Sequence, residues 1–147
     1  MKEYCLGFAF PRIELANEEV VLIRKNRPAF QNGKLNGVGG KVEKGESGIA
    51  AMCREFKEET GVSTEESDWR HVCTFIFENN HIHVLTTSHC RFGACRTTTD
   101  EEVVIRPISS LCYEEKMENL GWLVPMCLVA LQHPGSFFPF LVEHYPE

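Results

Sequence analysis

Three glutamates crowd one short stretch of the chain: Glu55, Glu58 and Glu59. Residues three or four apart on a helix share a face, so Glu55 would meet both of the others. Like charges at this spacing destabilise an isolated helix, and a hard divalent cation such as Mg2+ or Mn2+ would neutralise them. The alternative is a solvated acidic face on which Arg54 pairs with Glu58 one turn later, and the charges by themselves favour that alternative.

The residues around the three glutamates change this balance. Apolar side chains recur at helical spacing on the opposite face, at Ile49, Met52, Cys53 and Phe56. Ser47 can cap the start of the helix, and Gly61 can supply the left-handed residue that ends it. The pattern predicts a helix over 47–60 with one buried face and one acidic face, entered from a glycine-rich loop.

The spacing of the whole stretch is the most specific signal in the sequence. Gly40 is followed after five residues by Glu46, and after seven more by Arg54-Glu55-Phe56-Lys57-Glu58-Glu59-Thr60-Gly61-Val62. This stretch resembles the Nudix box, in which Gly, Glu, Arg-Glu, Glu-Glu and Gly occupy these positions and bulky apolar residues occupy two more. Every fixed position is met, with Phe56 and Val62 at the two apolar positions. The motif is strong evidence for the family and carries no information on the substrate.

Nudix enzymes hydrolyse a nucleoside diphosphate linked to a further group, usually by attack of water on phosphorus with carboxylate-bound metal. The resemblance implies that Glu55 and Glu59 are the principal Mg2+ ligands, with Glu58 beside them. It also implies that the backbone carbonyl of Gly39 is a further ligand, and the glycine pair at 39–40 would allow that close approach.

The resemblance assigns supporting roles as well. Glu46 and Arg54 match a pair that holds the loop to the helix, a structural role. Relatives bring one more carboxylate from a later loop, as a metal ligand or a base. Glu101 and Glu102 are the candidates, with Glu102 slightly preferred and a solvated acidic turn as the alternative. Lys41 and Arg24 are candidate phosphate contacts, although a solvated role is equally open for Arg24.

The recognition of the base lies outside the box. Residues 27–43 resemble the same segment of Nudix enzymes that act on oxidised purine nucleoside triphosphates. That resemblance places Asn36 against the purine edge, which its amide donors and acceptor suit, and Phe30 where relatives have an aromatic ring. Phe75 and Phe77 alternate on one predicted strand, as a base-stacking pair would, but core packing is the more usual role of such phenylalanines.

A second polar pair stands later in the chain. Glu118 and Asn119 precede an apolar segment at the position where these relatives set polar residues against the base. Relatives of the human type have two aspartates there, so the match is incomplete. This pair therefore does not define the base preference, and the pyrophosphohydrolase chemistry does not depend on it.

Composition limits the other functions. The chain of 147 residues is predicted to form a single domain, 1–147, with 43% hydrophobic and 24% charged residues. Its net charge of −6 argues against a nucleic-acid-coating protein. We expect no secretory signal and no membrane span, because the apolar runs are short. The seven cysteines follow no disulfide framework, so reduced thiols and a cytoplasmic location are expected.

A histidine and cysteine cluster raises the question of zinc. His81, His83, His89, Cys90 and Cys95 lie close together in sequence. Their spacing is not typical of a zinc site, so polar strand residues and packed thiols are the preferred interpretation, although His81 and His83 would share one strand face.

The remaining pattern predicts an α/β (α+β) fold. Strands are predicted at 4–10, 20–24 and 102–107, a loop at 25–37, a hairpin of 68–78 and 81–91, and a second helix at 120–131, buried on most sides. Pro125 would be tolerated only near the first turn of that helix. This order suggests a mixed sheet between helices, which agrees with the α/β/α sandwich that the resemblance implies.

The sequence thus predicts a Mg2+-dependent Nudix pyrophosphohydrolase that releases pyrophosphate from a nucleoside triphosphate, with 8-oxo-dGTP as a candidate substrate. Other nucleoside diphosphate derivatives remain open: a nucleotide sugar, a dinucleoside polyphosphate or a capped RNA, the last disfavoured by the acidic charge. A Nudix-fold binding module that has lost catalysis is the alternative from another class, but the acidic residues that catalysis needs are all present.

Overall fold

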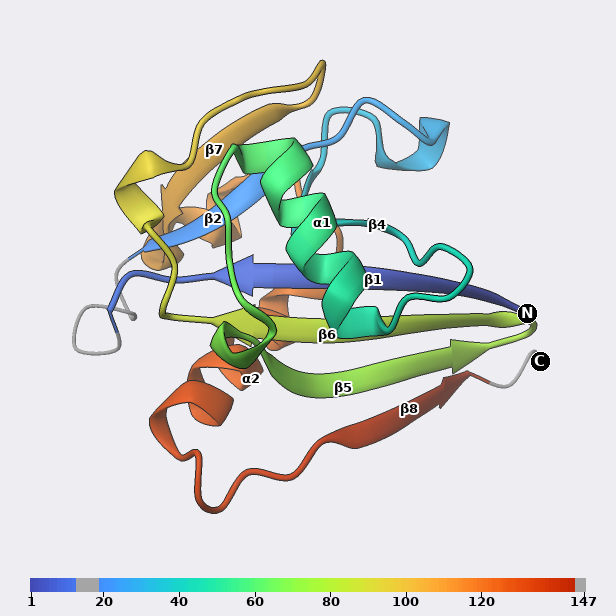
Figure 1. Cartoon of the computed structure of the whole chain (residues 1–147). Helices are drawn as coiled ribbons and strands as arrows, with labels where there is room; N and C mark the ends of the chain where they lie inside the picture. The colour runs from blue at the N-terminus through green and yellow to red at the C-terminus, as the bar shows by residue number, and fades with distance from the viewer. Residues whose placement is uncertain (13–18, 145–147) are drawn as a thin grey trace.

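The computed structural model describes residues 1–12 and 19–144 and contains one mixed β-sheet. The eight strands of the described part are β1 (Lys2–Ala9), β2 (Glu19–Arg24), β3 (Leu35–Asn36), β4 (Val38–Lys41), β5 (Arg70–Phe77), β6 (Asn80–Thr87), β7 (Glu102–Pro107) and β8 (Phe140–His144). The main path of the sheet runs β3-β2-β1-β6-β5-β8, while β4 pairs with β1 and β7 pairs with β2. β1 is parallel to β6 and antiparallel to β4, so it forms the centre of the sheet (Figure 1).

Two helices cover the two faces of this sheet. They are α1 (Gly48–Thr60) and α2 (Leu120–Gln132). Alternate residues of β2 point to opposite faces: Val20 and Leu22 pack in the core cluster under α2, whereas Val21 and Ile23 pack in the cluster under α1. Each face of the sheet therefore has its own apolar core, and the predicted α/β/α sandwich is confirmed.

The box helix forms where the sequence predicts it. The Ser47 hydroxyl accepts a hydrogen bond from the Ala50 amide, and Gly61 ends the helix in the left-handed conformation with φ of 78°. Met52 and Phe56 are fully buried, and Phe56 packs edge-on against Trp69 with ring centroids 5.2 Å apart. The buried face fixes how the helix is rotated, and thereby where its acidic face points.

The second helix differs in part from the prediction. Its extent agrees with the predicted 120–131, but only one face is buried, formed by Leu120, Leu123, Val124, Cys127 and Ala130. The opposite face includes Trp122 and Val129, which are 38% and 42% exposed. A uniformly apolar sequence does not reveal which side faces solvent. Pro125 lies in the second turn, on the exposed side, where it removes one N–H from the helix.

The strand predictions hold for five of the eight described strands. β1, β2, β7 and the β5–β6 hairpin lie where the sequence places them. The predicted loop over 25–37 also contains β3 and the short 3-10 helix η2 (Ala29–Gln31). Two further strands were not predicted: β4, which pairs with β1, and the edge strand β8, which pairs in parallel with β5. Three further 3-10 turns complete the described elements: η3 (Glu66–Asp68), η4 (Phe92–Ala94) and η5 (Ile108–Tyr113). Among the residues described, no helix has the length and apolar character that crossing a membrane requires.

Candidate active site

The carboxylate of Glu55 lies directly against the glycine pair of β4. A side-chain carbon at Gly40 would collide with this carboxylate, and one at Gly39 would collide with the backbone carbonyl of Cys5 on β1. Both positions therefore require glycine, because neighbouring atoms approach the backbone too closely for a side chain. At Gly39 the neighbour is strand β1, and at Gly40 it is the helix. The contact brings the backbone of β4 to the acidic face of α1.

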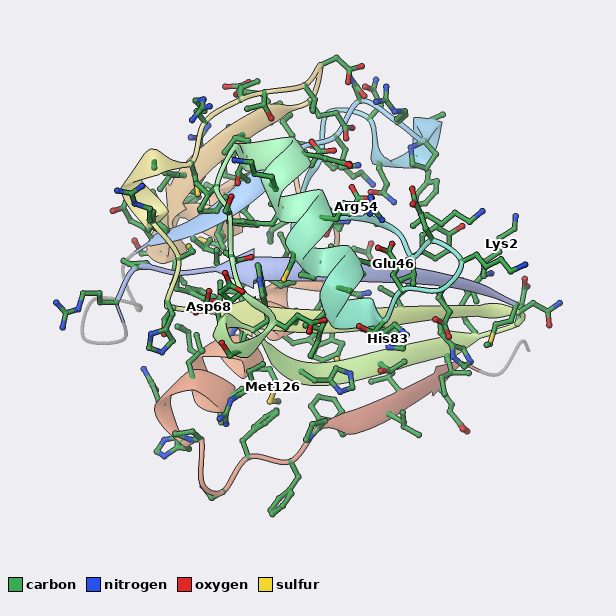
Figure 2. The ribbon with its side chains drawn as sticks, in the orientation of Figure 1. Lys2, Glu46, Arg54, Asp68, His83 and Met126 are labelled. Carbon is green, nitrogen blue, oxygen red and sulfur yellow. The ribbon has the colours of Figure 1, made fainter. Side chains whose placement is uncertain are left out.

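Arg54 links the loop before α1 to the helix. Its guanidinium donates to both carboxylate oxygens of Glu46, at 2.6 and 3.2 Å, and to Glu55 Oε1 at 2.7 Å. It also donates to the backbone carbonyl of Lys41 at 2.9 Å, and it lies 3.5 Å from Glu58. Figure 2 shows Arg54 and Glu46 together on the side of α1 that faces the preceding loop. Hydrogen bonding from Arg54 holds the pKa of Glu46 below its ordinary value, and Glu55 is oriented by the same cation.

Glu58 and Glu59 differ in their surroundings. The Glu58 side chain is 56% exposed, whereas Glu59 is half-buried and accepts a hydrogen bond from the Thr99 hydroxyl at 3.0 Å. Burial raises the pKa of Glu59, and the charges of Glu101 and Glu55 raise it further. These two neighbours place Glu59 among like charges, a situation that a bound cation would relieve.

Of the two later glutamates, Glu101 is the one beside Glu59. It is buried and accepts hydrogen bonds from Lys25 Nζ at 2.8 Å and from the Asn26 amide at 2.7 Å. Burial works to raise the pKa of Glu101, but the Lys25 and Asn26 hydrogen bonds outweigh it and the pKa is lowered. Glu102 is exposed and lies opposite Arg24 in the β2–β7 register. Glu101 precedes β7 and is held inside by these two hydrogen bonds, whereas Glu102 is the first residue of β7 and is exposed to solvent.

A cavity of about 540 Å3 opens beside the glycine pair. The predicted residues on its wall are Phe30, Asn36, Gly39, Lys41 and Phe77. The wall also includes residues that were not predicted, among them Tyr4, Leu6, Lys25, Arg27, Gln31 and Ile82. These residues come from β1, from β6 and from the segment before β3. Because they are far apart in the sequence, no local motif predicts that they line one cavity. Phe30 is 65% exposed at the cavity, which is unusual for a phenylalanine and separates it from the core.

Other predicted residues lie away from this cavity wall. Phe75 packs edge-on against Trp122 with centroids 5.6 Å apart and belongs to the periphery of the core under α2. Arg24 donates to the Gly33 carbonyl at 3.2 Å and lies 3.9 Å from Glu114. The next residue, Lys25, lines the cavity in its place.

The polar pair before α2 is also outside the cavity wall. Glu118 and Asn119 are both exposed, and Asn119 is the residue that precedes α2. The Asn119 carbonyl accepts hydrogen bonds from the amides of Trp122 and Leu123, while its side chain makes no capping bond. The pair therefore starts the helix and does not contribute to the cavity wall.

The residues at the acidic face of α1 suit a hard cation. Mg2+ prefers oxygen ligands, and here the Glu55 carboxylate stands against Gly40, next to the backbone carbonyl of Gly39. Within residues 1–12 and 19–144, no three His, Cys, Asp or Glu side chains are already gathered around one point as in a closed metal site. A backbone carbonyl and water would complete such a shell, as is usual for Mg2+.

The histidine cluster is organised by hydrogen bonds. The Thr74 hydroxyl lies 2.8 Å from His71 Nε2 and 3.2 Å from His83 Nδ1. The rings of His81 and His83 are 6.5 Å apart, and His83 lies beneath the first turn of α1 (Figure 2). The seven cysteines are free thiols. Burial raises the pKa of Cys5 to about 12, which keeps this buried thiol protonated.

Comparisons with known proteins agree with this architecture. A family model described as NUDIX domain matches residues 7–119. The 8-oxo-dGTP diphosphatase of Escherichia coli (strain K12) is 32% identical over 77 residues, which cover 52% of this chain and 60% of that protein. The match thus spans less than two thirds of the relative.

Solved structures show the same fold at lower identity. A MutT structure from a study of Aliivibrio salmonicida and Vibrio cholerae has a TM-score of 0.71 at 22% identity, covering 87% of this chain and 97% of that one. The MutT protein of Bacillus halodurans has a TM-score of 0.68 at 16% identity, covering 99% and 92%. The E. coli ORF135 protein also has a TM-score of 0.68, at 18% identity, covering 92% and 94%.

Proposed function

This chain belongs to the Nudix family, and from that premise we propose that it is a metal-dependent pyrophosphohydrolase acting on a purine nucleoside triphosphate. The products would be the nucleoside monophosphate and pyrophosphate, with 8-oxo-dGTP as one candidate substrate. One observation carries the proposal: Gly40 touches the Glu55 carboxylate and also lines the cavity. A nucleotide whose base occupies the cavity would therefore extend its phosphates towards the acidic face of α1.

The chain offers a ligand set for Mg2+, with Mn2+ as a substitute. Glu55, Glu59 and the Gly39 carbonyl would hold the ion, and the exposed Glu58 would complete the acidic face. A bound ion would neutralise phosphate charge and lower the pKa of a water nucleophile. Arg54 keeps the Glu55 carboxylate against Gly40 through its 2.7 Å hydrogen bond, so the ligand is oriented before the ion arrives.

A further carboxylate is best supplied by Glu101. It lies on the same side as Glu59 and raises the pKa of that group, whereas Glu102 is exposed on the neighbouring strand position. Lys25 holds Glu101 ionised. An ionised carboxylate at this position is suited to orient a water molecule or to accept its proton.

The cavity wall supplies the remaining interactions. Lys25, Arg27 and Lys41 place three cations around it, and each would offset phosphate charge. Phe30 and Phe77 provide aromatic surfaces against which a base would stack. Asn36 supplies a polar group for the purine edge.

Hydrolysis of a nucleotide panel with Mg2+, with pyrophosphate and orthophosphate measured separately, tests the proposal. We expect pyrophosphate from purine nucleoside triphosphates and little product from nucleotide sugars, dinucleoside polyphosphates or capped RNA. Glu59→Gln should remove nearly all Mg2+-dependent turnover, because it removes the charge of a proposed metal ligand. The circular dichroism spectrum should stay unchanged. Undiminished hydrolysis by this variant would exclude the assigned site, and binding without any hydrolysis would indicate a non-catalytic module.

A further inference from the structure

The amide of Asn36 is held in one orientation by the backbone. Gly37 is buried against β1, and a side chain there would meet the Gly7 carbonyl at 2.8 Å and Leu6 at 3.0 Å. The position of the Gly37 amide is therefore fixed by close packing. This amide donates a hydrogen bond of 2.8 Å to Asn36 Oδ1. Because an N–H group requires an acceptor, the oxygen of the Asn36 side chain is committed to the backbone.

The nitrogen of the Asn36 side chain consequently points the other way. Asn36 Nδ2 donates to Gln31 Oε1 at 3.3 Å. The backbone of Gln31 is itself fixed, since its amide donates to the Pro28 carbonyl and its carbonyl accepts from Lys34, both at 2.9 Å. Gln31 and Asn36 are both half-buried, and both line the cavity. The two side chains thus form one ordered pair.

This pair leaves hydrogen-bond donors for a ligand. Asn36 Nδ2 has a second hydrogen, and Gln31 Nε2 has two. Within the described residues, Gln31 Nε2 makes no hydrogen bond. Both carbonyl oxygens of the pair already accept a hydrogen bond. Three N–H hydrogens of the pair are thus free, whereas each carbonyl oxygen has one lone pair left, so the pair offers more donors than acceptors and favours a ligand edge that carries acceptors.

We propose that Gln31, together with Asn36, selects a 6-oxo-purine over a 6-amino-purine, and that Gln31 is the specificity-determining residue. This inference rests on the proposed function and names the class of base. Guanine presents the acceptors O6 and N7, whereas adenine presents an amino group at position 6 that would face the donors of the pair. Hypoxanthine keeps both acceptors, whereas 8-oxoguanine keeps O6 but carries a hydrogen on N7. O6 is therefore the acceptor that the three 6-oxo bases share and the one on which this inference rests.

The pair acts through the orientation of two amides. Gln31→Glu keeps an oxygen to accept from Asn36 Nδ2 but replaces the outer donor with an acceptor. The variant should therefore lose its preference for the 6-oxo base. Discrimination by a well-placed amide changes affinity ratios by about tenfold or more, and the added negative charge affects all monophosphates alike, so that it cancels in a ratio.

Binding of dIMP, dGMP and dAMP, measured by calorimetry on the full chain, tests the inference without turnover. We expect the wild-type protein to bind dIMP and dGMP similarly and dAMP at least about tenfold more weakly. In Gln31→Glu the dIMP-to-dAMP affinity ratio should fall by about the same factor. Gln132→Glu is the matched control: the same change at the exposed end of α2 should leave the ratio unaltered.

The outcomes separate this inference from the proposed function. Equal or undetectable binding of dIMP and dAMP by the wild-type protein overturns the inference, as does an unchanged ratio in a folded Gln31→Glu variant. Gln31→Met, which removes both polar atoms, should also lower the ratio, so a folding defect of one variant does not decide the matter. If no nucleotide is hydrolysed, the proposed function fails while the base preference is still measured.

Discussion

The acidic site and the base cavity are built in opposite ways. The acidic site, which comprises Gly39, Gly40, Glu55, Glu58 and Glu59, comes from one continuous stretch of β4, loop and α1. The base cavity takes its wall from β1, from residues 25–37, from the end of β5 and from β6, and it meets the acidic site at β4. The acidic site is held largely by contacts within the stretch, with β4 also paired to β1, whereas the base cavity depends on strand pairing across the sheet. Chemistry and selectivity should accordingly respond to different substitutions.

The largest effect is expected at the acidic site. Glu55→Gln removes the charge of the carboxylate that touches Gly40 and should lower kcat with every nucleotide by about a hundredfold or more, because metal-borne charge stabilisation contributes several kcal/mol. Steady-state hydrolysis assays with saturating Mg2+ measure this loss of kcat. Glu66→Gln, at an exposed glutamate on η3, is the control and should behave as wild type. A loss confined to one base would contradict the separation of the two regions.

The second largest effect is expected from a steric change where the acidic site meets the base cavity. Gly40→Ala places a methyl group where the Glu55 carboxylate lies and should lower kcat by up to about a hundredfold, since a displacement of roughly 1 Å can cost this much. Gly93→Ala is the matched control and should keep full activity, because a side chain there has no neighbour within 4 Å. Full activity of Gly40→Ala would mean that the glycine is not needed for the contact.

A smaller effect is expected in the base cavity. Asn36→Ala removes the hydrogen bonds to Gln31 and to the Gly37 amide, so it should change kcat/KM ratios among nucleotides by about tenfold while residual hydrolysis continues. The measurement is kcat/KM for dGTP, dATP and dCTP. An equal loss of kcat/KM with all three nucleotides would show that Asn36 does not recognise the base.

The smallest effect concerns stability and its dependence on pH. Glu101 is buried, and hydrogen bonds from Lys25 and Asn26 lower its pKa below 4.5 despite that burial. A carboxylate with a depressed folded pKa stabilises the protein fully above the unfolded value, and this contribution is lost as the pH falls through the folded pKa. Glu101→Gln should therefore cost about 1–2 kcal/mol near pH 7 and progressively less below about pH 4.5.

Thermal unfolding at several pH values measures this difference. Glu102→Gln, at the exposed neighbouring position, should unfold like the wild-type protein throughout. A constant gap between Glu101→Gln and wild type from neutral to acid pH would show that ionisation of Glu101 does not contribute to stability.

The sequence by itself determined the elements that local chemistry encodes. The cap at Ser47, the left-handed Gly61 and the apolar face with Phe56 defined α1 within a residue, because each acts over one or two turns. The pairing of Arg54 with Glu46, eight residues apart, was implied by the resemblance to the Nudix box, and the structure contains this ion pair. The hairpin and β7 followed from alternation of apolar residues.

Only the tertiary structure decided the rest. β8 is an edge strand that pairs with β5 from far along the chain, and its short sequence does not distinguish it from a loop. Glu101, just before β7, is buried by its hydrogen bonds to Lys25 and Asn26, while Glu102, the first residue of β7, is exposed; both depend on the pairing of β7 with β2. Gln31 lacks a motif, and its position beside Asn36 arises when η2 folds back towards β3. Local signals place the acidic residues, whereas the base cavity exists only after distant strands have paired.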